Sequence, residues 1–437
     1  MKITIIGTGY VGLVTGACFA DLGNIVYCVD SDRGKIDSLK KGKITIYEPG
    51  LEEMVRQNME EGRIYFSTNI KSSVKKSDMV FICVGTPSRE GGEPDLLALE
   101  NVSREIAKNI NNYKLIVEKS TVPVETGQWV KRTISAFSAS GGKDRKAKFD
   151  IACNPEFLRE GTAIKDFMHP DRVVIGVESE RAKNILLDLY KPLSAPIVVT
   201  DIKSAEIIKH ASNSFLAMKI SFINAISVIC EKVGADIKEV ARGIGLDKRI
   251  GREFLNAGLG FGGSCFPKDI AAFIHMAEKA GYRFDLLREV RNINENQKDI
   301  IIEKISKAIW NIPGKTIGVL GLSFKPDTDD IRNAPPMDII KRLIEQGAKI
   351  KAYDPKAMKK ARKVFKKGIT YCKDIYSAAK GSDCLVVLTD WNEFKEIDFK
   401  RLKKLLKQPV IVDGRNIYDP YRVKKLGFTY TGIGRRA

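Results

Sequence analysis

The first 30 residues constrain the fold more than any other stretch of the chain. An apolar run, Ile3 to Ile6, leads into the glycine-rich segment G-T-G-Y-V-G, Gly7 to Gly12. Apolar residues at helical spacing follow and stop at Gly23, and a second apolar run, Ile25 to Val29, ends in Asp30. The order strand, glycine turn, helix, strand, acid is typical of the first βαβ unit of a doubly wound α/β sheet.

The glycine segment also carries a chemical prediction. Glycines permit a tight turn and let the backbone approach a pyrophosphate, which rests on the N-terminus of the following helix. Asp30 lies 18 residues after Gly12, near the spacing expected for a carboxylate that binds the adenine ribose. That carboxylate would repel a 2′-phosphate, so the pattern favours NAD over NADP. Lys35 either meets the pyrophosphate or is a solvated lysine.

Strands and helices alternate through most of the chain, which predicts the class α/β with two Rossmann-like doubly wound parallel-sheet domains. A long central helix and a helical dimerisation region are expected to join them. The second domain begins with a glycine turn that lacks the full fingerprint, so we expect it to bind something other than a second dinucleotide. The expected domains are 1–200, 201–300 and 301–437. The expected strands after the first two lie near residues 64–66, 79–84, 115–117, 151–153, 315–320, 349–353, 385–388 and 410–413.

One helical pattern runs from Asp201 to Val233 without glycine or proline and ends at Gly234. A helix of this length commonly joins domains and pairs with a copy of itself, so we expect a homodimer or a higher homo-oligomer. Lys209 and Asn213 are four residues apart and therefore share one face. Asparagine is a poor helix former, which indicates a specific hydrogen bond, although a solvated lysine and a neutral asparagine fit equally well.

The stretch Gly258 to Asp269, G-L-G-F-G-G-S-C-F-P-K-D, combines four glycines with one cysteine. Pro267 suits the first turn of a helix, which places Cys265 at the positive end of that helix with Lys268 nearby. Both features favour the thiolate and predict a nucleophile. The alternative is a glycine turn followed by a small buried apolar residue.

Several loops follow predicted strands, where the ligand crevice of such a sheet lies. They are 84–88 (V-G-T-P-S), 119–123 (K-S-T-V-P) and 154–161 (N-P-E-F-L-R-E-G), and each also fits ordinary turn chemistry. In the second domain, Phe324, Lys325 and Arg415 are candidates to hold a nucleotide's base and phosphates.

Composition narrows the class of protein. The formal charge of +19 calls for an acidic partner, either nucleic acid or a phosphorylated small molecule. The eight cysteines are scattered without metal-ligand spacing, which argues for a reducing, cytoplasmic location and against a structural metal site. The chain shows no signal-peptide pattern and no apolar run of membrane-spanning length, so we expect no membrane partner. The basic stretch 141–148 is expected to be an exposed loop.

Taken together, these motifs resemble the UDP-glucose 6-dehydrogenases, within the wider group of nucleotide-sugar dehydrogenases. The resemblance covers essentially the whole chain and rests on G-T-G-Y-V-G, V-G-T-P, K-S-T-V-P, N-P-E-F-L-R-E-G-T-A-I, K-x-x-x-N, G-F-G-G-S-C-F-P-K-D and F-K-P-D-T-D-D-I-R. It implies oxidation of the primary alcohol of UDP-glucose to a carboxylate, with two NAD reduced per sugar through a thiohemiacetal and a thioester on Cys265.

The resemblance also implies a role for each site residue. Lys209 and Asn213 would stabilise the oxyanion, Asp269 would assist proton transfer, and Thr121 and Glu156 would position water. The implied NAD contacts are Gly7, Gly9, Tyr10, Val11, Gly12, Asp30, Lys35, Thr86, Thr121, Glu160 and Arg332. The implied substrate contacts are Glu156, Phe157, Leu158, Arg159, Lys209, Asn213, Arg249 of the other subunit, Phe254, Gly262, Phe324, Lys325 and Arg415.

Two alternatives remain open. GDP-mannose or a UDP-N-acetylhexosamine would keep the reaction and change the substrate; the glycine of N-P-E-F-L-R-E-G and the cysteine motif favour UDP-glucose. The second alternative is a basic nucleic-acid-binding protein with a vestigial Rossmann fold. Salt-dependent DNA binding that ignores NAD would support it, whereas NADH formation from a nucleotide sugar would support the enzyme.

Overall fold

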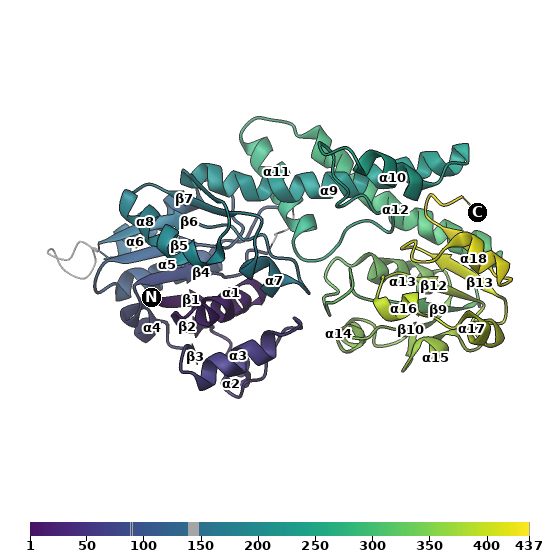
Figure 1. The fold of residues 1–437 in the computed structure, drawn as a ribbon, viewed down its shortest axis with the longest axis horizontal. Coiled ribbons are helices and arrows are strands. Elements are labelled where there is room, and N and C mark those ends of the chain that lie inside the picture. Colours follow the sequence, from purple (N-terminus) through teal and green to yellow (C-terminus); the bar gives the residue numbers. More distant parts are fainter. Residues whose placement is uncertain (88, 90, 139–147, 437) are drawn as a thin grey trace. The chain divides into compact units, whose positions relative to one another are not determined.

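The computed structural model describes residues 1–87, 89, 91–138 and 148–436. The chain divides into two compact units. Unit 1 contains Met1–Ser212 and Ala271–Gly281, and unit 2 contains Asn213–Ile270 and Tyr282–Ala437. Each unit holds one sheet (Figure 1). All but Lys148 of the expected basic loop 141–148 lies outside the described residues.

Unit 1 is built on an eight-stranded sheet with the order β3-β2-β1-β4-β5-β6-β7-β8. Its pairs are parallel except for β6 and β7, which run antiparallel. The strands are β1 (Lys2–Ile6), β2 (Ile25–Val29), β3 (Ile64–Ser67), β4 (Met79–Ile82), β5 (Lys114–Glu118), β6 (Phe149–Cys153), β7 (Val173–Val177) and β8 (Ile197–Thr200).

Helices cover both faces of this sheet. Alternate residues of a central strand belong to two different hydrophobic clusters, one on each face. Met79 and Phe81 of β4 belong to one cluster, and Val80 and Ile82 belong to the other. Successive side chains of a strand point to opposite faces, so both faces are buried. The helices are α1 (Tyr10–Asp21), α2 (Arg33–Leu39), α3 (Leu51–Glu60), α4 (Ile70–Lys76), α5 (Leu97–Asn109), α6 (Thr126–Ser138), α7 (Ala163–Met168) and α8 (Glu180–Tyr190), with a 3-10 turn at Lys191–Leu193.

Unit 2 contains a six-stranded, all-parallel sheet with the order β11-β10-β9-β12-β13-β14, the order of a Rossmann sheet. Cys384 and Val386 of β12 enter one cluster and Leu385 and Val387 the other, so this sheet is also covered on both faces. The strands are β9 (Thr316–Leu320), β10 (Lys349–Tyr353), β11 (Ile369–Tyr371), β12 (Cys384–Val387), β13 (Val410–Asp413) and β14 (Thr429–Gly432). The helices are α13 (Pro335–Glu345), α14 (Met358–Val364), α15 (Ile375–Ala379), α16 (Asn392–Lys395), α17 (Phe399–Leu405) and α18 (Pro420–Lys425).

Four helices occupy the middle of the chain: α9 (Ile202–Val233), α10 (Ile237–Gly245), α11 (Phe266–Lys279) and α12 (Asp285–Ile309). The boundary between the units falls inside α9, after Ser212. By length and composition α9 could cross a membrane, since one 18-residue window reaches a mean hydropathy of 1.5 with 44% of it buried. A core helix of a soluble protein passes the same test, so one such helix is weak evidence for a membrane span.

The expected fold class is therefore confirmed: two parallel-sheet α/β domains and a long central helix. The pattern missed β7, β8, β11 and β14. β8, β11 and β14 are edge strands of three or four residues, which bury less apolar surface than a central strand. β7 joins the sheet by pairing antiparallel with β6. A prediction of a wholly parallel sheet contains no such strand.

Candidate active site

Asp30, at the end of β2, closes the glycine turn of unit 1. Its Oδ2 accepts hydrogen bonds from the Thr8 N–H at 2.9 Å and the Thr8 hydroxyl at 2.8 Å. Lys35 Nζ donates to the same oxygen at 2.9 Å, so Lys35 pairs with Asp30 rather than being simply solvated. Burial opposes ionisation, but these bonds and one from the Asp32 N–H lower the pKa of Asp30 to about 2. The carboxylate is therefore ionised at neutral pH.

The glycines of this turn meet the steric demands of a dinucleotide site. A Cβ on Gly12 would lie 1.8 Å from the Gly7 carbonyl oxygen, and Gly7 has φ +97°. A Cβ on Gly9 would meet nothing within 4 Å, so that side of the turn is open space. Gly9 is also the N-cap of α1 and offers no side-chain cap, which leaves the helix N-terminus to a ligand. These residues, with Tyr10 and Val11 in the first turn of α1, fit an NAD pyrophosphate and ribose.

Glu48 ties the glycine turn to the loop after β6. The carboxylate, 4% exposed, accepts the Ala163 N–H at 2.7 Å and the Gly161 N–H at 2.6 Å. The Tyr10 hydroxyl also contacts it. Glu160, a predicted cofactor contact, immediately precedes Gly161. The fingerprint and the 154–161 loop are thus one connected part of unit 1.

Two further predicted residues meet at the carboxyl ends of β4 and β5. Thr86 is buried, and its hydroxyl donates to the Thr121 carbonyl at 2.8 Å. Ser120 donates to the Val84 carbonyl at 2.8 Å, which joins the same two loops a second time. The V-G-T-P and K-S-T-V-P loops therefore lie side by side, as expected of crevice loops.

Lys209 and Glu156 form a buried ion pair in unit 1. Lys209 Nζ lies 3.0 Å from Glu156 Oε1. The other carboxylate oxygen, Oε2, accepts the Leu158 N–H at 2.6 Å, so Glu156 has a partner on each oxygen. A cation and a carboxylate held together in a buried place can orient water or a polar substrate group.

Lys119 lies near this ion pair. The sequence indicated this residue only as part of the 119–123 loop. Its Nζ donates to Asn154 Oδ1 at 2.8 Å, and Asn154 Nδ2 donates to the Val174 carbonyl at 2.8 Å. Burial lowers the pKa of Lys119 to about 8. The buried amine thus anchors the start of the N-P-E turn that carries Glu156.

The aromatic ring of Phe157 is flanked by two cations. The Arg172 guanidinium lies 3.6 Å from the ring centroid, and Lys209 Nζ lies 5.3 Å from it. These contacts fix the ring beside the ion pair. Arg159, by contrast, pairs with Asp166, and 59% of its side chain is exposed. Of the predicted substrate contacts in this loop, Glu156 and Phe157 contact Lys209 and Leu158 donates its N–H to Glu156, whereas Arg159 is largely exposed.

Two buried carboxylates lie beneath the 119–127 loop. Glu206 accepts the N–H groups of Glu125 at 2.8 Å and Gly127 at 2.9 Å. Glu118 is 1% exposed, and neither of its carboxylate oxygens has a hydrogen-bond partner among the described residues. Burial, with the neighbouring Glu206, raises the pKa of Glu118 well above its ordinary value. The folded protein therefore favours the protonated, neutral form of Glu118.

In unit 2, Cys265 stands at the start of α11. Its carbonyl accepts the first helical hydrogen bond, from the Asp269 N–H at 2.8 Å. All eight cysteines lie in the described part of the chain as thiols outside any disulfide, and Cys265 alone is exposed. The interpretation of Cys265 as a buried apolar residue is therefore wrong. An exposed thiol at a helix N-terminus has the environment of a nucleophile.

Asp269 and Asn213 lie in direct contact. Asn213 Nδ2 donates to Asp269 Oδ2 at 2.6 Å, and Lys268 Nζ lies 2.7 Å from Asp269 Oδ1. Both Asn213 and Asp269 are buried. The asparagine in the long helix thus makes the specific hydrogen bond that its poor helix propensity indicates. Lys268, expected to act on Cys265, is paired with the neighbouring carboxylate.

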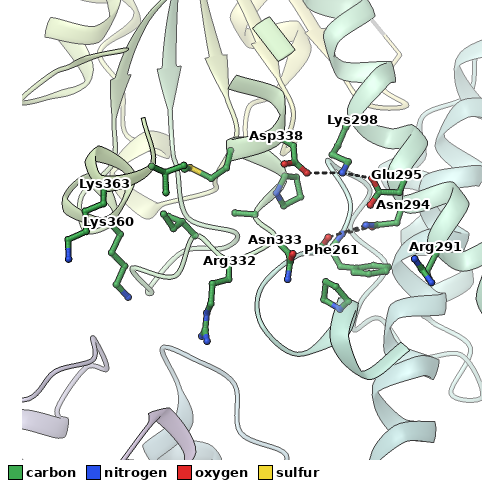
Figure 2. Close-up of a pocket in the computed structure, with 16 residues that line it drawn as sticks. Phe261, Arg291, Asn294, Glu295, Lys298, Arg332, Asn333, Asp338, Lys360 and Lys363 are labelled. Atoms are coloured by element: carbon green, nitrogen blue, oxygen red, sulfur yellow. Dashed lines mark hydrogen bonds and ion pairs between the residues drawn. The ribbon is translucent and has the colours of Figure 1, made fainter. Parts of the chain in front are cut away.

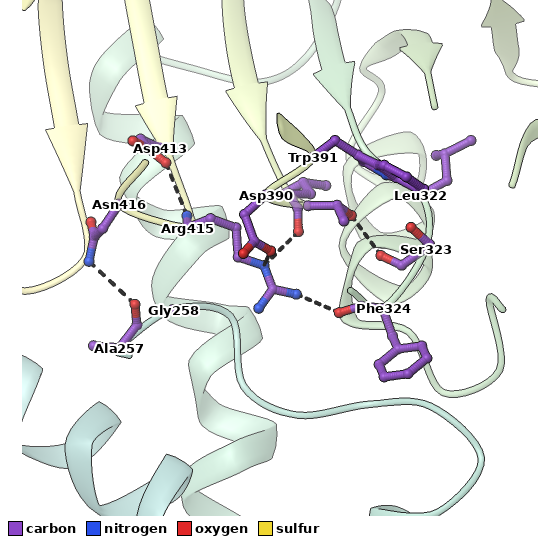
Figure 3. A network of polar contacts seen from close by, with 12 residues as sticks. Ala257, Gly258, Leu322, Ser323, Phe324, Asp390, Trp391, Asp413, Arg415 and Asn416 are labelled. Atoms are coloured by element: carbon purple, nitrogen blue, oxygen red, sulfur yellow. Dashed lines mark hydrogen bonds and ion pairs between the residues drawn. The ribbon is translucent and has the colours of Figure 1, made fainter. Parts of the chain in front are cut away.

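Arg415 joins three loops at the carboxyl edge of the second sheet (Figure 3). Its Nε donates to the Leu388 carbonyl at 2.9 Å and its NH2 to the Phe324 carbonyl at 2.7 Å. Burial lowers the pKa of Arg415. Phe324 and Lys325 are adjacent, with Lys325 Nζ 5.9 Å from the Phe324 ring centroid. The three predicted nucleotide contacts of this domain therefore form one group.

Unit 2 holds a cavity of about 590 Å³, and the predicted residue Gly262 packs against Asn333, one of the residues that line it (Figure 2). A Cβ on Gly262 would lie 2.4 Å from the Asn333 carbonyl oxygen, in the turn that lines this cavity. Arg332 also lines it and pairs with Asp330 through a side chain that is 62% exposed. Phe254 adopts φ +63°, and its ring lies 6.3 Å from that of Phe266. Arg249 is set apart from these groups: it pairs with Asp247 and is 89% exposed.

Among the described residues, no group of three or more His, Cys, Asp or Glu side chains could hold a metal ion. Three further residues of these contacts were not predicted from the sequence: Glu48, Arg172 and Asn294. A signal existed for Asn294, because it falls at a buried position of α12 between Val290 and Ile301. A polar residue on an apolar helix face indicates a hydrogen bond within the core.

Comparison with known proteins supports one family along the whole chain. Residues 1–194 match the UDP-glucose/GDP-mannose dehydrogenase family, NAD binding domain. Residues 203–296 match the central domain of that family, and residues 318–420 match its UDP binding domain.

Individual proteins give the same result. The chain is 49% identical to the UDP-glucose 6-dehydrogenase TuaD of Bacillus subtilis (strain 168), over 100% of this chain and 94% of that protein. It is also 49% identical to the UDP-glucose 6-dehydrogenase of Rhizobium meliloti (strain 1021), over 100% of both. A solved UDP-glucose dehydrogenase from Pyrobaculum islandicum superposes with a TM-score of 0.92 at 38% identity, covering 99% of this chain and 97% of that one. The resemblance expected from the motifs is confirmed, and the chain belongs to the UDP-glucose/GDP-mannose dehydrogenase family, whose N-terminal domain binds NAD.

Proposed function

We propose that this protein is an NAD-dependent UDP-glucose 6-dehydrogenase that oxidises UDP-glucose to UDP-glucuronate. The observation that most directly supports the proposal is the place of Cys265, an exposed thiol at the first turn of α11, four residues before the buried Asp269. An ordinary alcohol dehydrogenase stops at the aldehyde and needs no such thiol. The relatives at 49% identity carry this activity in their names.

The reaction removes four electrons in two hydride transfers, and NAD accepts one hydride in each. The sugar C6 alcohol first loses a proton and a hydride to become an aldehyde. The Cys265 thiolate then adds to the aldehyde carbon, and the resulting thiohemiacetal loses the second hydride to become a thioester. Water attacks the thioester, the carbon–sulfur bond breaks, and the products are the carboxylate and the regenerated thiolate.

The residues of the two units would divide this work. Lys209 and Asn213 would stabilise the oxyanion at C6, because a cation and an amide donor favour developing negative charge. Asp269 would take part in proton transfer, and Glu156 with Thr121 would place the hydrolytic water. Phe157 and Leu158, beside the ion pair, would contact the sugar. Phe324, Lys325 and Arg415 would bind the uridine diphosphate, Phe254 and Gly262 would border the sugar, and Arg332 would meet NAD.

A second copy of the chain is the proposed partner. α9 exposes Phe215, Phe222 and Ile229, which are 57%, 51% and 54% exposed. A spacing of seven residues places them on one stripe of the helix, as in a helix–helix seam. We propose that two copies pair through this stripe, with Arg249 reaching the substrate of the partner. We also propose that residues 1–200, 201–300 and 301–437 are the functional segments of the chain. Because none of the eight cysteines forms a disulfide, we propose a cytoplasmic location.

The experiment that tests this function counts NADH against product. Purified protein is incubated with UDP-glucose, UDP-galactose, GDP-mannose and UDP-N-acetylglucosamine in turn, and the products are separated by chromatography. We expect two NADH per UDP-glucuronate and no released aldehyde. Faster turnover of GDP-mannose or of the N-acetylhexosamine would assign the alternative substrate, and one NADH with free aldehyde would reject the thioester route.

Cysteine variants sharpen the test. Cys265→Ala should lose acid formation by several orders of magnitude, in keeping with loss of a nucleophile. Cys265→Ser should accumulate a covalent ester detectable by mass spectrometry, because an alkoxide leaves less readily than a thiolate. Cys230→Ala, which changes a buried cysteine of α9, is the matched control. Near-normal acid production by Cys265→Ala would mean that the thiol takes no part in the chemistry.

A further inference from the structure

Asn294 of α12 holds the glycine loop that precedes Cys265. The side chain is 6% exposed and makes two hydrogen bonds to one residue of that loop. Its Oδ1 accepts the Phe261 N–H at 2.7 Å, and its Nδ2 donates to the Phe261 carbonyl at 3.1 Å (Figure 2). A primary amide is the side chain that can accept and donate in this way, since a carboxylate lacks the donor and an alkyl chain lacks both.

The conformation of the loop depends on this contact. Gly260 adopts φ +93°, and a Cβ there would lie 2.4 Å from Asn294 Oδ1. Glycine is therefore required at this position for both its left-handed backbone and its lack of a side chain. Part of the glycine content of the Cys265 loop thus serves close approach to Asn294.

A chain of packed residues leads from Asn294 to the thiol. The Phe261 ring is 7% exposed and meets the Phe266 ring edge to face, with centroids 5.9 Å apart and an angle of 84°. Phe266 follows Cys265 directly and opens α11. On its other side the loop is held by Asn333, whose Nδ2 donates to the Gly263 carbonyl at 3.2 Å. The contacts on Phe261 and Gly263 leave Ser264 and Cys265 as a short bridge into the helix.

We propose that Asn294 is a positioning residue for Cys265, which fixes the thiol at the N-terminus of α11 by clamping Phe261. The proposal rests on the proposed function, in which Cys265 is the nucleophile. Both hydrogen bonds described for Asn294 go to the backbone of Phe261, so Asn294 acts on the thiol through the backbone of the loop. Small misplacements of a reacting group are costly, so the clamp should matter to rate more than to binding.

Selective alkylation gives a readout that requires no substrate. Because the other seven cysteines are buried, iodoacetamide should modify Cys265 first in the folded protein, and peptide mass spectrometry can follow that residue. We would compare Asn294→Asp, which keeps the acceptor for the Phe261 N–H but sets an oxygen against the Phe261 carbonyl, with Asn294→Ala. Asn292→Ala is the control, since Asn292 is exposed on the same helix and bonds only to Glu289 among the contacts described.

Both Asn294 variants should alkylate several-fold more slowly at pH 7.5 and lose about tenfold to a hundredfold in kcat, with KM for UDP-glucose and NAD within about twofold. Circular dichroism at the assay temperature shows whether each variant is folded. If Asn294→Ala unfolds, the test rests on Asn294→Asp, which is the smaller change. Unchanged alkylation and kcat in a folded variant would overturn the proposal, as would an equal loss in Asn292→Ala. If alkylation slows but the unaltered protein oxidises no nucleotide sugar, the proposed function fails while the clamp stands.

Discussion

Lys209 Nζ lies 3.0 Å from Glu156 Oε1, and the two side chains are only 5% and 6% exposed. The partners come from α9 and from the loop after β6, 53 positions apart in sequence. Removing one member of a buried ion pair leaves an uncompensated charge, whereas removing both does not. The pair therefore couples the candidate catalytic lysine to the loop that carries the predicted substrate contacts.

A double-mutant cycle measures that coupling. Lys209→Met should lower the free energy of unfolding by about 3–5 kcal/mol, because it strands the Glu156 carboxylate. Adding Glu156→Gln should restore part of this loss while turnover stays abolished. Urea unfolding followed by circular dichroism gives the free energies. Additive losses in the double variant would show that the two residues are not energetically coupled.

Cofactor choice should depend on Asp30. Its ionised carboxylate repels a 2′-phosphate, so the unaltered protein should use NAD with clear preference over NADP. Asp30→Ala should lower the ratio of kcat/KM for NAD to kcat/KM for NADP, chiefly because it weakens the binding of NAD. Asp32→Ala, which removes the N-cap of α2 next to Asp30, controls for local damage to the turn. Equal use of both cofactors by the unaltered protein would contradict the assignment.

Glu118 and Glu206 should make stability fall as pH rises. Burial, opposed in part by backbone hydrogen bonds, raises the pKa of Glu206 to about 7. Because the folded protein binds protons that the unfolded chain releases, the stability from this group is complete below about pH 4.5 and is lost as pH rises towards 7. Burial also raises the pKa of Glu118 well above its ordinary value, so the stability from this group is likewise lost as pH rises.

Replacing Glu118 with methionine removes its share of this dependence. Glu118→Met should gain stability relative to the unaltered protein as pH rises from 5 to 8, by at most about 1.4 kcal/mol per pH unit. Thermal unfolding at four pH values measures the gap. Glu105→Gln, an exposed carboxylate on α5, should track the unaltered protein throughout. A gap that stays constant with pH would show that the fold does not raise the pKa of Glu118.

Local signals predicted the parts of the fold and site that lie close together in sequence. The β1–α1–β2 unit with Asp30 needs only 30 residues, and Cys265 with α11 needs only the glycine loop and Pro267. The pairs Lys209–Glu156 and Asn213–Asp269 join residues more than 50 positions apart, so only tertiary structure reveals them. Glu48 and Arg172 were missed for the same reason. Only the folded structure brings Glu48 to Gly161 and Arg172 to Phe157.

The exposed stripe of α9 predicts how the chain associates. Phe222→Glu should convert a dimer to a monomer, because a charge in a helix–helix seam is costly to bury. Size-exclusion chromatography with light scattering gives the mass. Tyr421→Glu, at an aromatic residue of α18 that is 67% exposed, is the control and should leave the mass unchanged. An unaltered protein that is an active monomer would rule out the interface.

Arg249 then tests whether the partner completes the site. Its side chain is 89% exposed and held only by Asp247 among the contacts described, as expected of a residue that serves another subunit. Arg249→Ala should raise the KM for UDP-glucose strongly and leave NAD binding nearly unchanged. Unfolding and refolding a mixture of Arg249→Ala and Cys265→Ala chains should restore activity, because in a hybrid dimer one site receives an intact Cys265 from one chain and an intact Arg249 from the other. Random pairing makes about a quarter of all sites intact. The same mixture prepared in the Phe222→Glu background should stay inactive, and a mixture of dimers that regains no activity would show that Arg249 acts within its own chain.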